Sequence, residues 1–233
     1  MAQLRLLACL ISLLLAGCTA VGIHDPALRG QIDFGPPDAV AICVYIDDGL
    51  TDADARTLVH DAWRKEEPLY RLTVSVVSVT HWPRPAFTMN GIMRALRRQP
   101  LAAPCDRVLA LIGRNAADFL FSLLPLPEVL GAVDDETLTH GYAVARWASL
   151  NQVFTPPRAA MRHELYHLLG CDEHFNMPRC YEQIAYLKRW KRTHHSDFFP
   201  AWDSIRKRLL TSRDEVNARL AALVPPSSNS GTR

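Results

Sequence analysis

Residues 155–174 of the 233-residue chain read TPPRAAMRHELYHLLGCDEH. The segment opens with a Thr and two Pro, which predicts a helix capped by Thr155 with Pro156 as its first helical residue. It then runs without a break to Gly170, a residue that readily adopts the left-handed conformation that ends many helices. This stretch is therefore the best-bounded helix that the sequence predicts.

Two histidines and a glutamate on that helix indicate a metal site. His163 and His167 are four residues apart, so their side chains lie on one face, one turn apart, and can bind one zinc ion. Neutral imidazoles leave the charge of zinc uncancelled, so a bound water becomes acidic near neutral pH. Glu164 lies next to the open position and can take that proton. Because HExxH also arises by chance, an amphipathic helix with two surface histidines and no metal is the alternative.

The segment HELYHLLGCDEH, residues 163–174, resembles the HExxHxxGxxH pattern of the metzincin zinc peptidases. In that family the Gly turns the chain so that a third His reaches the same zinc. By strict count Glu173 takes the third position here, and His174 follows one residue later. The resemblance favours His174 as the ligand, with one extra residue in the turn, and leaves Glu173 or Asp172 as an acidic alternative.

The resemblance extends loosely over residues 39–180 and is similar to archaemetzincin- and matrixin-like peptidases. It implies a zincin-like fold and a peptidase that acts on a protein or peptide. The edge strand of the sheet, within residues 129–147, would hold the substrate in an extended form. It also implies a methionine in a turn beneath the zinc, for which Met177 is the candidate, because no other Met follows His174.

Four further side chains have a functional interpretation and a structural one. Tyr181 is either a hydrogen-bond donor to the tetrahedral oxyanion or a packing residue on a helix. His194 and His195 are either a second ligand pair, or the oxyanion donor, or a solvated pair in a basic segment. Glu182 is a candidate distal glutamate ligand, although it follows HExxH closely for a second helix to fold back. For all four, the structural interpretation is the favoured one.

The N-terminus, MAQLRLLACLISLLLAGC, has an early Arg followed by an apolar run too short for an ordinary membrane span. Residues 1–17 are therefore a predicted signal peptide. LLAGC, residues 14–18, resembles the bacterial lipobox, in which the cysteine, here Cys18, becomes the lipid-bearing first residue. Thr19 next to it resembles lipoproteins of the outer membrane in double-membraned bacteria. The implied location is the cell envelope, with a membrane anchor of more than one acyl chain.

Export changes how the remaining cysteines are interpreted. Cys43, Cys105, Cys171 and Cys180 are an even number in an oxidising compartment, which favours disulfides. Three pairings are possible. We favour Cys171–Cys180, which would staple the segment after the histidines, and Cys43–Cys105, which would link two strands. Zinc binding by these cysteines is disfavoured, because the chain has no CxxC spacing.

The apolar patterns predict a mixed α/β (α+β) fold, in which helices cover a twisted mixed sheet and the C-terminal part is helical. Strands are expected at residues 39–46, 70–82 and 106–113, with a strand pair within 129–147. Helices are expected at residues 51–66, 89–99, 116–124, 155–170, 181–190 and 199–224. A tether (residues 18–37), one domain (38–222) and a disordered tail (223–233) complete the predicted organisation.

The composition is that of a globular protein, with 48% hydrophobic residues, 21% charged residues and a net charge of +2. Such a balance argues against a nucleic-acid-binding protein. The basic runs at residues 187–195 and 206–208 are interpreted as solvated helix faces. Two functions therefore compete. One is a zinc peptidase with Glu164 as general base, and the other is a non-catalytic envelope lipoprotein that uses zinc for structure or for docking a partner.

Overall fold

A computed structural model describes residues 24–113, 118, 129–146, 152, 155–174 and 176–224. The expected signal peptide, the lipidation site Cys18, most of the helix expected at 116–124 and the tail after residue 224 lie outside these ranges. Within the described residues, no helix combines the length and the apolar character needed to cross a membrane.

A five-stranded mixed sheet forms the centre of the molecule. Its strands are β1 (Asp38–Ile46), β2 (Leu72–His81), β3 (Arg107–Ile112), β4 (Gly131–Val133) and β5 (His140–Val144). They are arranged in the order β2-β1-β3-β5-β4. The first four in this order run parallel, and β4 runs antiparallel to β5 at the edge of the sheet. The predicted mixed α/β fold is thus confirmed, as is the strand pair, whose outer member is an edge strand.

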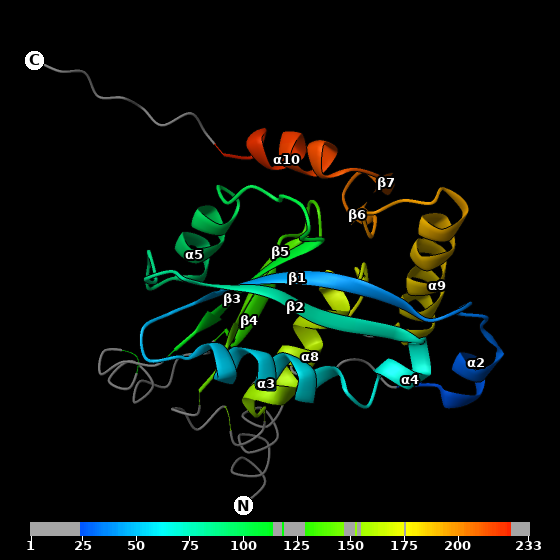
Figure 1. Ribbon diagram of the computed structural model, residues 1–233, viewed down its shortest axis with the longest axis horizontal. Coiled ribbons are helices and arrows are strands. Elements are labelled where there is room, and N and C mark those ends of the chain that lie inside the picture. The colour runs from blue at the N-terminus through cyan, green and yellow to red at the C-terminus, as the bar shows by residue number, and fades with distance from the viewer. Residues whose placement is uncertain are drawn as a thin grey trace, which may run out of the picture.

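Helices cover both faces of this sheet (Figure 1). Helices α3 and α8 lie on one face, α5 and α10 lie on the other, and α9 stands at one end. The helices are α2 (Pro26–Gln31), α3 (Asp52–Trp63), α4 (Glu67–Tyr70), α5 (Met89–Leu96), α8 (Pro157–Leu168), α9 (Met177–Thr193) and α10 (Arg213–Ala221).

Strand β3 shows why the sheet needs cover on both sides. All six of its residues are buried. Leu109 and Leu111 pack into the main core with α3, α8 and α9, whereas Val108, Ala110 and Ile112 pack into a second core with α5 and α10. Alternate side chains of a strand point to opposite faces, so a strand covered on both faces is apolar along most of its length, here from Val108 to Ile112.

The C-terminal part differs from the continuous helix expected over residues 199–224. Residues 201–210 form a hairpin of β6 (Ala201–Asp203) and β7 (Arg208–Leu210), and only α10 is helical. The carboxylate of Asp203 accepts hydrogen bonds from the backbone N–H groups of Ile205 and Arg206. Such side-chain bonds to nearby backbone compete with helix formation, which explains why the helical prediction was wrong here.

The segment expected to be a structureless tether also carries structure. Residues 26–31 form α2, which begins at Pro26 after an Asp25 cap whose side chain accepts from Leu28 N. The hydroxyl of Tyr181 on α9 accepts a hydrogen bond from Asp25 N and lies 2.9 Å from His24 Nδ1. The domain therefore holds the chain from His24 onward.

Candidate metal centre

Helix α8 carries the histidine pair as the sequence predicts, with one correction at its start. Pro156 is the cap and Pro157 the first helical residue, one position later than expected. The hydroxyl of Thr155 is buried without a hydrogen-bond partner among the described residues, so Thr155 does not cap this helix. His163 and His167 lie one turn apart on the same face and are both buried.

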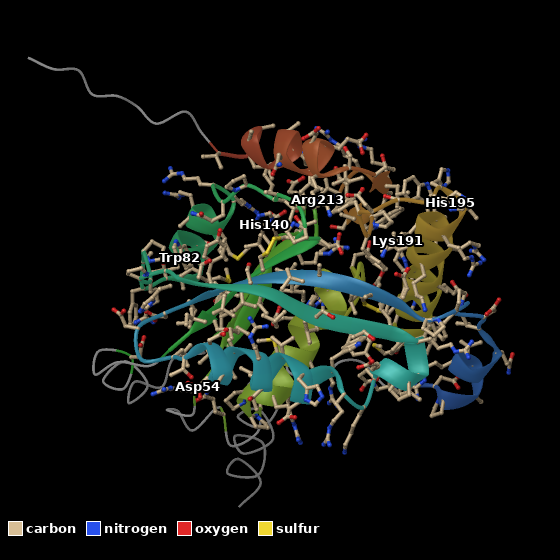
Figure 2. The ribbon with its side chains drawn as sticks, in the orientation of Figure 1. Asp54, Trp82, His140, Lys191, His195 and Arg213 are labelled. Atoms are coloured by element: carbon tan, nitrogen blue, oxygen red, sulfur yellow. A yellow bond between two sulfur atoms is a disulfide. The ribbon has the colours of Figure 1, made fainter. Side chains whose placement is uncertain are left out.

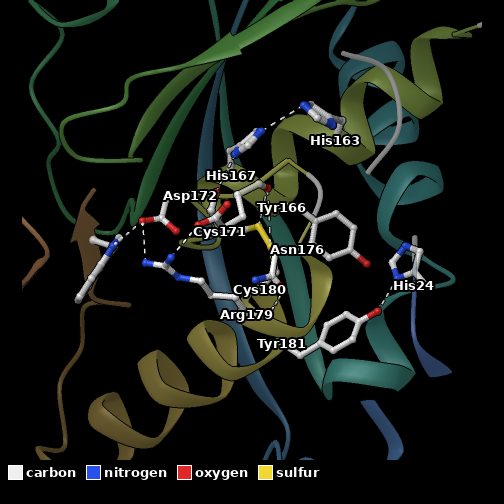
Figure 3. The surroundings of a disulfide bond; sticks show 12 residues. His24, His163, Tyr166, His167, Cys171, Asp172, Asn176, Arg179, Cys180 and Tyr181 are labelled. Carbon is white, nitrogen blue, oxygen red and sulfur yellow. Dashed lines mark hydrogen bonds and ion pairs between the residues drawn. A yellow bond between two sulfur atoms is a disulfide. The ribbon is translucent and has the colours of Figure 1, made fainter. Parts of the chain in front are cut away.

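The two imidazoles present nitrogen atoms to each other. Their Nε2 atoms are 3.1 Å apart. The Nδ1 of His167 lies 2.7 Å from the carbonyl oxygen of Cys171. A carbonyl only accepts, so Nδ1 is the donor, and the Nε2 lone pair of the neutral ring is left free for a metal. Figure 3 shows both rings beside α8, above the disulfide.

Both rings are neutral at physiological pH. Burial lowers the pKa of His163 to about 3, with further contributions from His167 and His174. Burial also lowers the pKa of His167 to about 4, and the hydrogen bond to Cys171 acts in the opposite direction. Because only the neutral imidazole can bind a metal, this environment keeps the ligands in their binding form.

His174 completes the cluster. One nitrogen from each of His163, His167 and His174 can be chosen so that all three lie within 4.8 Å of one another. The ring of His174 is 4.6 Å from that of His167 and 5.4 Å from that of His163, measured between centroids. Two imidazoles on a tetrahedral zinc place their nitrogens about 3.3 Å apart, so the measured 3.1 Å between the Nε2 atoms fits zinc. The three residues therefore offer three imidazole nitrogens close enough together to hold a metal ion.

The turn after α8 depends on Gly170. Its φ is +100°, and a Cβ atom there would lie 2.4 Å from Cδ1 of Leu187 on α9. Only glycine fits both the backbone conformation and the space. The predicted left-handed helix end is confirmed, and this turn brings His174 back toward the helix.

Two acidic residues beside His174 are bound by other partners. The carboxylate of Asp172 accepts hydrogen bonds from Trp202 Nε1 at 3.2 Å and from Lys207 Nζ at 2.8 Å. Glu173 accepts one from Arg179 at 2.7 Å. The structure therefore groups His174, and neither of the two carboxylates, with the histidine pair.

Glu164 follows His163 on α8 and is buried, with 4% of its surface exposed. Its side chain packs against Gly131 at the start of β4. Burial raises the pKa of Glu164 to about 8. At that pKa the carboxyl group holds its proton at neutral pH, and the positive charge of a bound zinc ion would favour its ionised, basic form.

Both favoured disulfides are present. Cys171 is bonded to Cys180 and Cys43 to Cys105, with Cα–Cα distances of 4.7 Å and 5.6 Å. The first bond links the ligand-bearing turn to the first turn of α9 (Figure 3). All four sulfur atoms are thus engaged, and none is available as a thiolate ligand.

The other residues singled out in the sequence lie outside the cluster. The hydroxyl of Tyr181 contacts His24. Glu182 is exposed on α9. His194 stacks on Trp190, and His195 is exposed at the end of α9 (Figure 2).

Met177 is the first residue of α9 and is buried in the main core. It therefore begins a helix, whereas the metzincin methionine lies in a turn. For Tyr181, Glu182, His194 and His195 the favoured structural interpretation fits, because each side chain either contacts a neighbour or lies exposed at the surface.

The sequence patterns did not indicate the residues that hold the turn carrying His174. Trp202 and Lys207 lie in or between the hairpin strands that were expected to be helical, so no local pattern pointed to them. Gly131 was also missed, although an isolated Gly in a strand pattern is a known sign of a close approach.

Comparisons with known proteins assign no family. No protein-family model and no curated protein match the chain. Chains of solved structures do match, among them one titled "Structure of a chaperone-substrate complex", at 17% identity and a TM-score of 0.39. The match covers 57% of this chain and 23% of that chain, so it spans less than a quarter of the known structure. A similarity of this size supports no statement about function.

Proposed function

We propose that this protein is a zinc-dependent peptidase of the cell envelope, anchored to the outer membrane by lipid at Cys18. His163, His167 and His174 hold the zinc ion, and Glu164 is the general base. The observation that carries the proposal is the grouping of three imidazole nitrogens within 4.8 Å, two of them from the helix that also carries the buried Glu164.

The three imidazoles supply neutral donors, which leaves the full charge of the ion available. Zinc bound there would polarise a peptide carbonyl and acidify a water molecule. Glu164 accepts the proton of that water and carries it to the leaving amine. The hydrogen bond from His167 Nδ1 to Cys171 fixes the tautomer and the orientation of one ligand.

Edge strand β4 is the surface that we assign to the substrate. It pairs with β5 on one side and is the last strand of the sheet on the other. An extended peptide can add to such an edge through backbone hydrogen bonds. Since Gly131 of β4 packs against Glu164, a peptide bound there would run close to the general base.

The ion pair between Glu173 and Arg179 favours an enzyme over a structural zinc module. A non-catalytic site would close the fourth coordination position, and Glu173, next to His174 in the sequence, could supply that ligand in addition to His174. Its carboxylate is instead paired with Arg179. Three imidazoles with a free fourth position are typical of catalytic zinc sites.

The test combines zinc analysis with a peptidase assay on the full-length protein purified in detergent. The wild type should contain about one zinc per chain and cleave members of a quenched fluorescent peptide library. Glu164→Gln should keep the zinc and lose about 10²–10⁴-fold in kcat. His167→Ala should lose the zinc.

Each other outcome has a defined meaning. If the protein contains zinc but cleaves no peptide, and a hydroxamate does not bind the metal, the structural zinc module would replace the enzyme as the proposed function. A folded wild type without zinc would overturn the metal site itself. Full activity in Glu164→Gln would exclude the role of Glu164.

A further inference from the structure

Gly131 is the first residue of edge strand β4 and faces the catalytic helix. It pairs with Ala143 of β5, and the residue before it, Leu130, accepts a hydrogen bond from Val144 N at 2.8 Å. The backbone of β4 is therefore held at this point by the sheet.

A side chain at position 131 would collide with the proposed general base. A Cβ atom built there would lie 2.5 Å from Oε1, 2.7 Å from Cδ and 2.7 Å from Cγ of Glu164. Carbon atoms in favourable contact are about 3.5–4.0 Å apart. The three nearest atoms all belong to one side chain, so the close approach is between the backbone of β4 and the side chain of Glu164.

The backbone conformation gives no other reason for glycine here. Gly35, Gly49 and Gly170 are the glycines with positive φ among the described residues, and Gly131 is not one of them. Glycine inside a strand weakens it, and where it occurs it often marks the close approach of another group. At position 131 that group is the carboxylate of Glu164.

The surroundings leave Glu164 little room to turn away. It is 4% exposed, and the next residue, Leu165, is fully buried in the main core. Helix α8 is therefore fixed by its packing, just as β4 is fixed by β5. An added methyl group at position 131 would push the Glu164 carboxylate out of the place that it occupies against β4.

We propose that Gly131 is a positioning residue for the general base. Its missing side chain lets the backbone of β4 lie directly against Glu164 and limit where the carboxylate can point. The inference rests on the proposed function for its catalytic meaning, but the contact itself can be tested without zinc and without substrate.

The test is a double-mutant cycle on the metal-free full-length chain, with the melting temperature as the readout. Gly131→Ala should lower Tm by about 4–8 °C in the wild-type background, the size expected for overpacking in a domain of this length. In the Glu164→Ala background the same change should lower Tm by no more than about 1 °C, because the colliding atoms are gone. Gly30→Ala is the matched control, since nothing lies within 4 Å of a Cβ atom at Gly30.

Two results of the cycle would overturn the proposal. Equal losses in both backgrounds would show that Gly131 serves only the strand backbone. No loss in either background would show that Glu164 has room for the methyl group.

Peptide turnover then separates this inference from the proposed function. In zinc-loaded Gly131→Ala, zinc content and KM should stay near the wild-type values while kcat falls about 100-fold. An inactive wild type would refute the peptidase but leave the thermal cycle to decide about Gly131. An active wild type whose kcat is unchanged by Gly131→Ala would refute the positioning role alone.

Discussion

The Nδ1 atom of His167 donates a hydrogen bond to the backbone carbonyl oxygen of Cys171, 2.7 Å away. Cys171 is itself bonded to Cys180 in the first turn of α9. One residue therefore orients a ligand through its carbonyl group and ties the turn that carries His174 through its sulfur atom. The disulfide thus supports two of the three proposed ligands.

Removal of this disulfide should weaken zinc binding beyond its effect on folding. The double change Cys171→Ser with Cys180→Ser opens a loop with a sequence separation of 9, which should cost about 2–3 kcal/mol of unfolding free energy. Loss of support for the ligands should lower zinc affinity by about 10–100-fold. Chelator competition measures the affinity, and denaturant titration measures the stability.

The other disulfide is the matched control for that experiment. Cys43–Cys105 has a sequence separation of 62, so its removal should cost more stability, about 4 kcal/mol. Cys105 packs in the second core with α5 and α10, so zinc affinity should stay within about twofold of wild type. Equal losses of affinity for both pairs would contradict a specific role for Cys171–Cys180.

The identity of the third ligand can be tested by paired substitutions. His174→Ala should lower zinc affinity by at least about 100-fold, because it removes a donor from a three-imidazole site. Glu173→Gln should change it by less than about threefold, because Glu173 is paired with Arg179 on an exposed surface. Zinc competition assays on the two variants decide the matter, and a reversed order would move the ligand to Glu173.

Arg107 should be one of the most sensitive positions for folding. It is fully buried, and its guanidinium donates to the carbonyl oxygens of Asp106, Leu168, Phe199 and Pro200. Arg107→Met would leave these acceptors buried without donors, at a cost of about 3 kcal/mol or more. Arg206→Met, at an exposed position, should stay within about 0.5 kcal/mol. Denaturant unfolding at neutral pH measures both.

His140 should make the fold sensitive to acid. Its ring is fully buried beside β5 (Figure 2), with Nε2 3.0 Å from Gln99 O and Nδ1 2.9 Å from Thr139 Oγ1. Burial lowers the pKa of His140 from 6.5 to about 4. Asp134 raises this pKa, and Arg107 and Arg97 lower it further.

The direction of the pH effect follows from proton binding. Between pH 6.5 and 4 the unfolded chain binds a proton that the folded chain does not, so the unfolding free energy falls as the pH falls. His140 should account for about 3 kcal/mol of that loss. The His140→Gln variant cannot bind this proton, so its unfolding free energy should fall less between pH 6.5 and 4 when measured by denaturant unfolding. Parallel losses in the two proteins would assign the acid sensitivity to other groups.

The sequence predicted the features that local signals determine. The prolines before α8, the spacing of His163 and His167 and the glycine at position 170 all lie within one short segment, and each has a local physical effect. The buried strands were recognised for the same reason, because burial on both faces of a sheet requires a continuous apolar run.

Features that depend on distant contacts were beyond the reach of the sequence. The pairing of Asp172 depends on Lys207, which lies far along the chain from it. Residues 199–224 have helical spacing, but the Asp203 side chain binds the backbone of the following turn and diverts the chain into a hairpin. The contact of Gly131 with Glu164 joins an edge strand to a helix that follows it in sequence.

The hairpin of β6 and β7 is synthesised after all three proposed zinc ligands. Asp172, in the turn that carries His174, is held by Trp202 and Lys207, and Arg107 is held by the carbonyl groups of Phe199 and Pro200. These partners follow α9 in the chain. A chain that has emerged only as far as α9 therefore contains every proposed ligand and both cysteines of the nearby disulfide, but neither Trp202 nor Lys207. The turn that carries His174 would reach its final set of contacts only after the hairpin has been made.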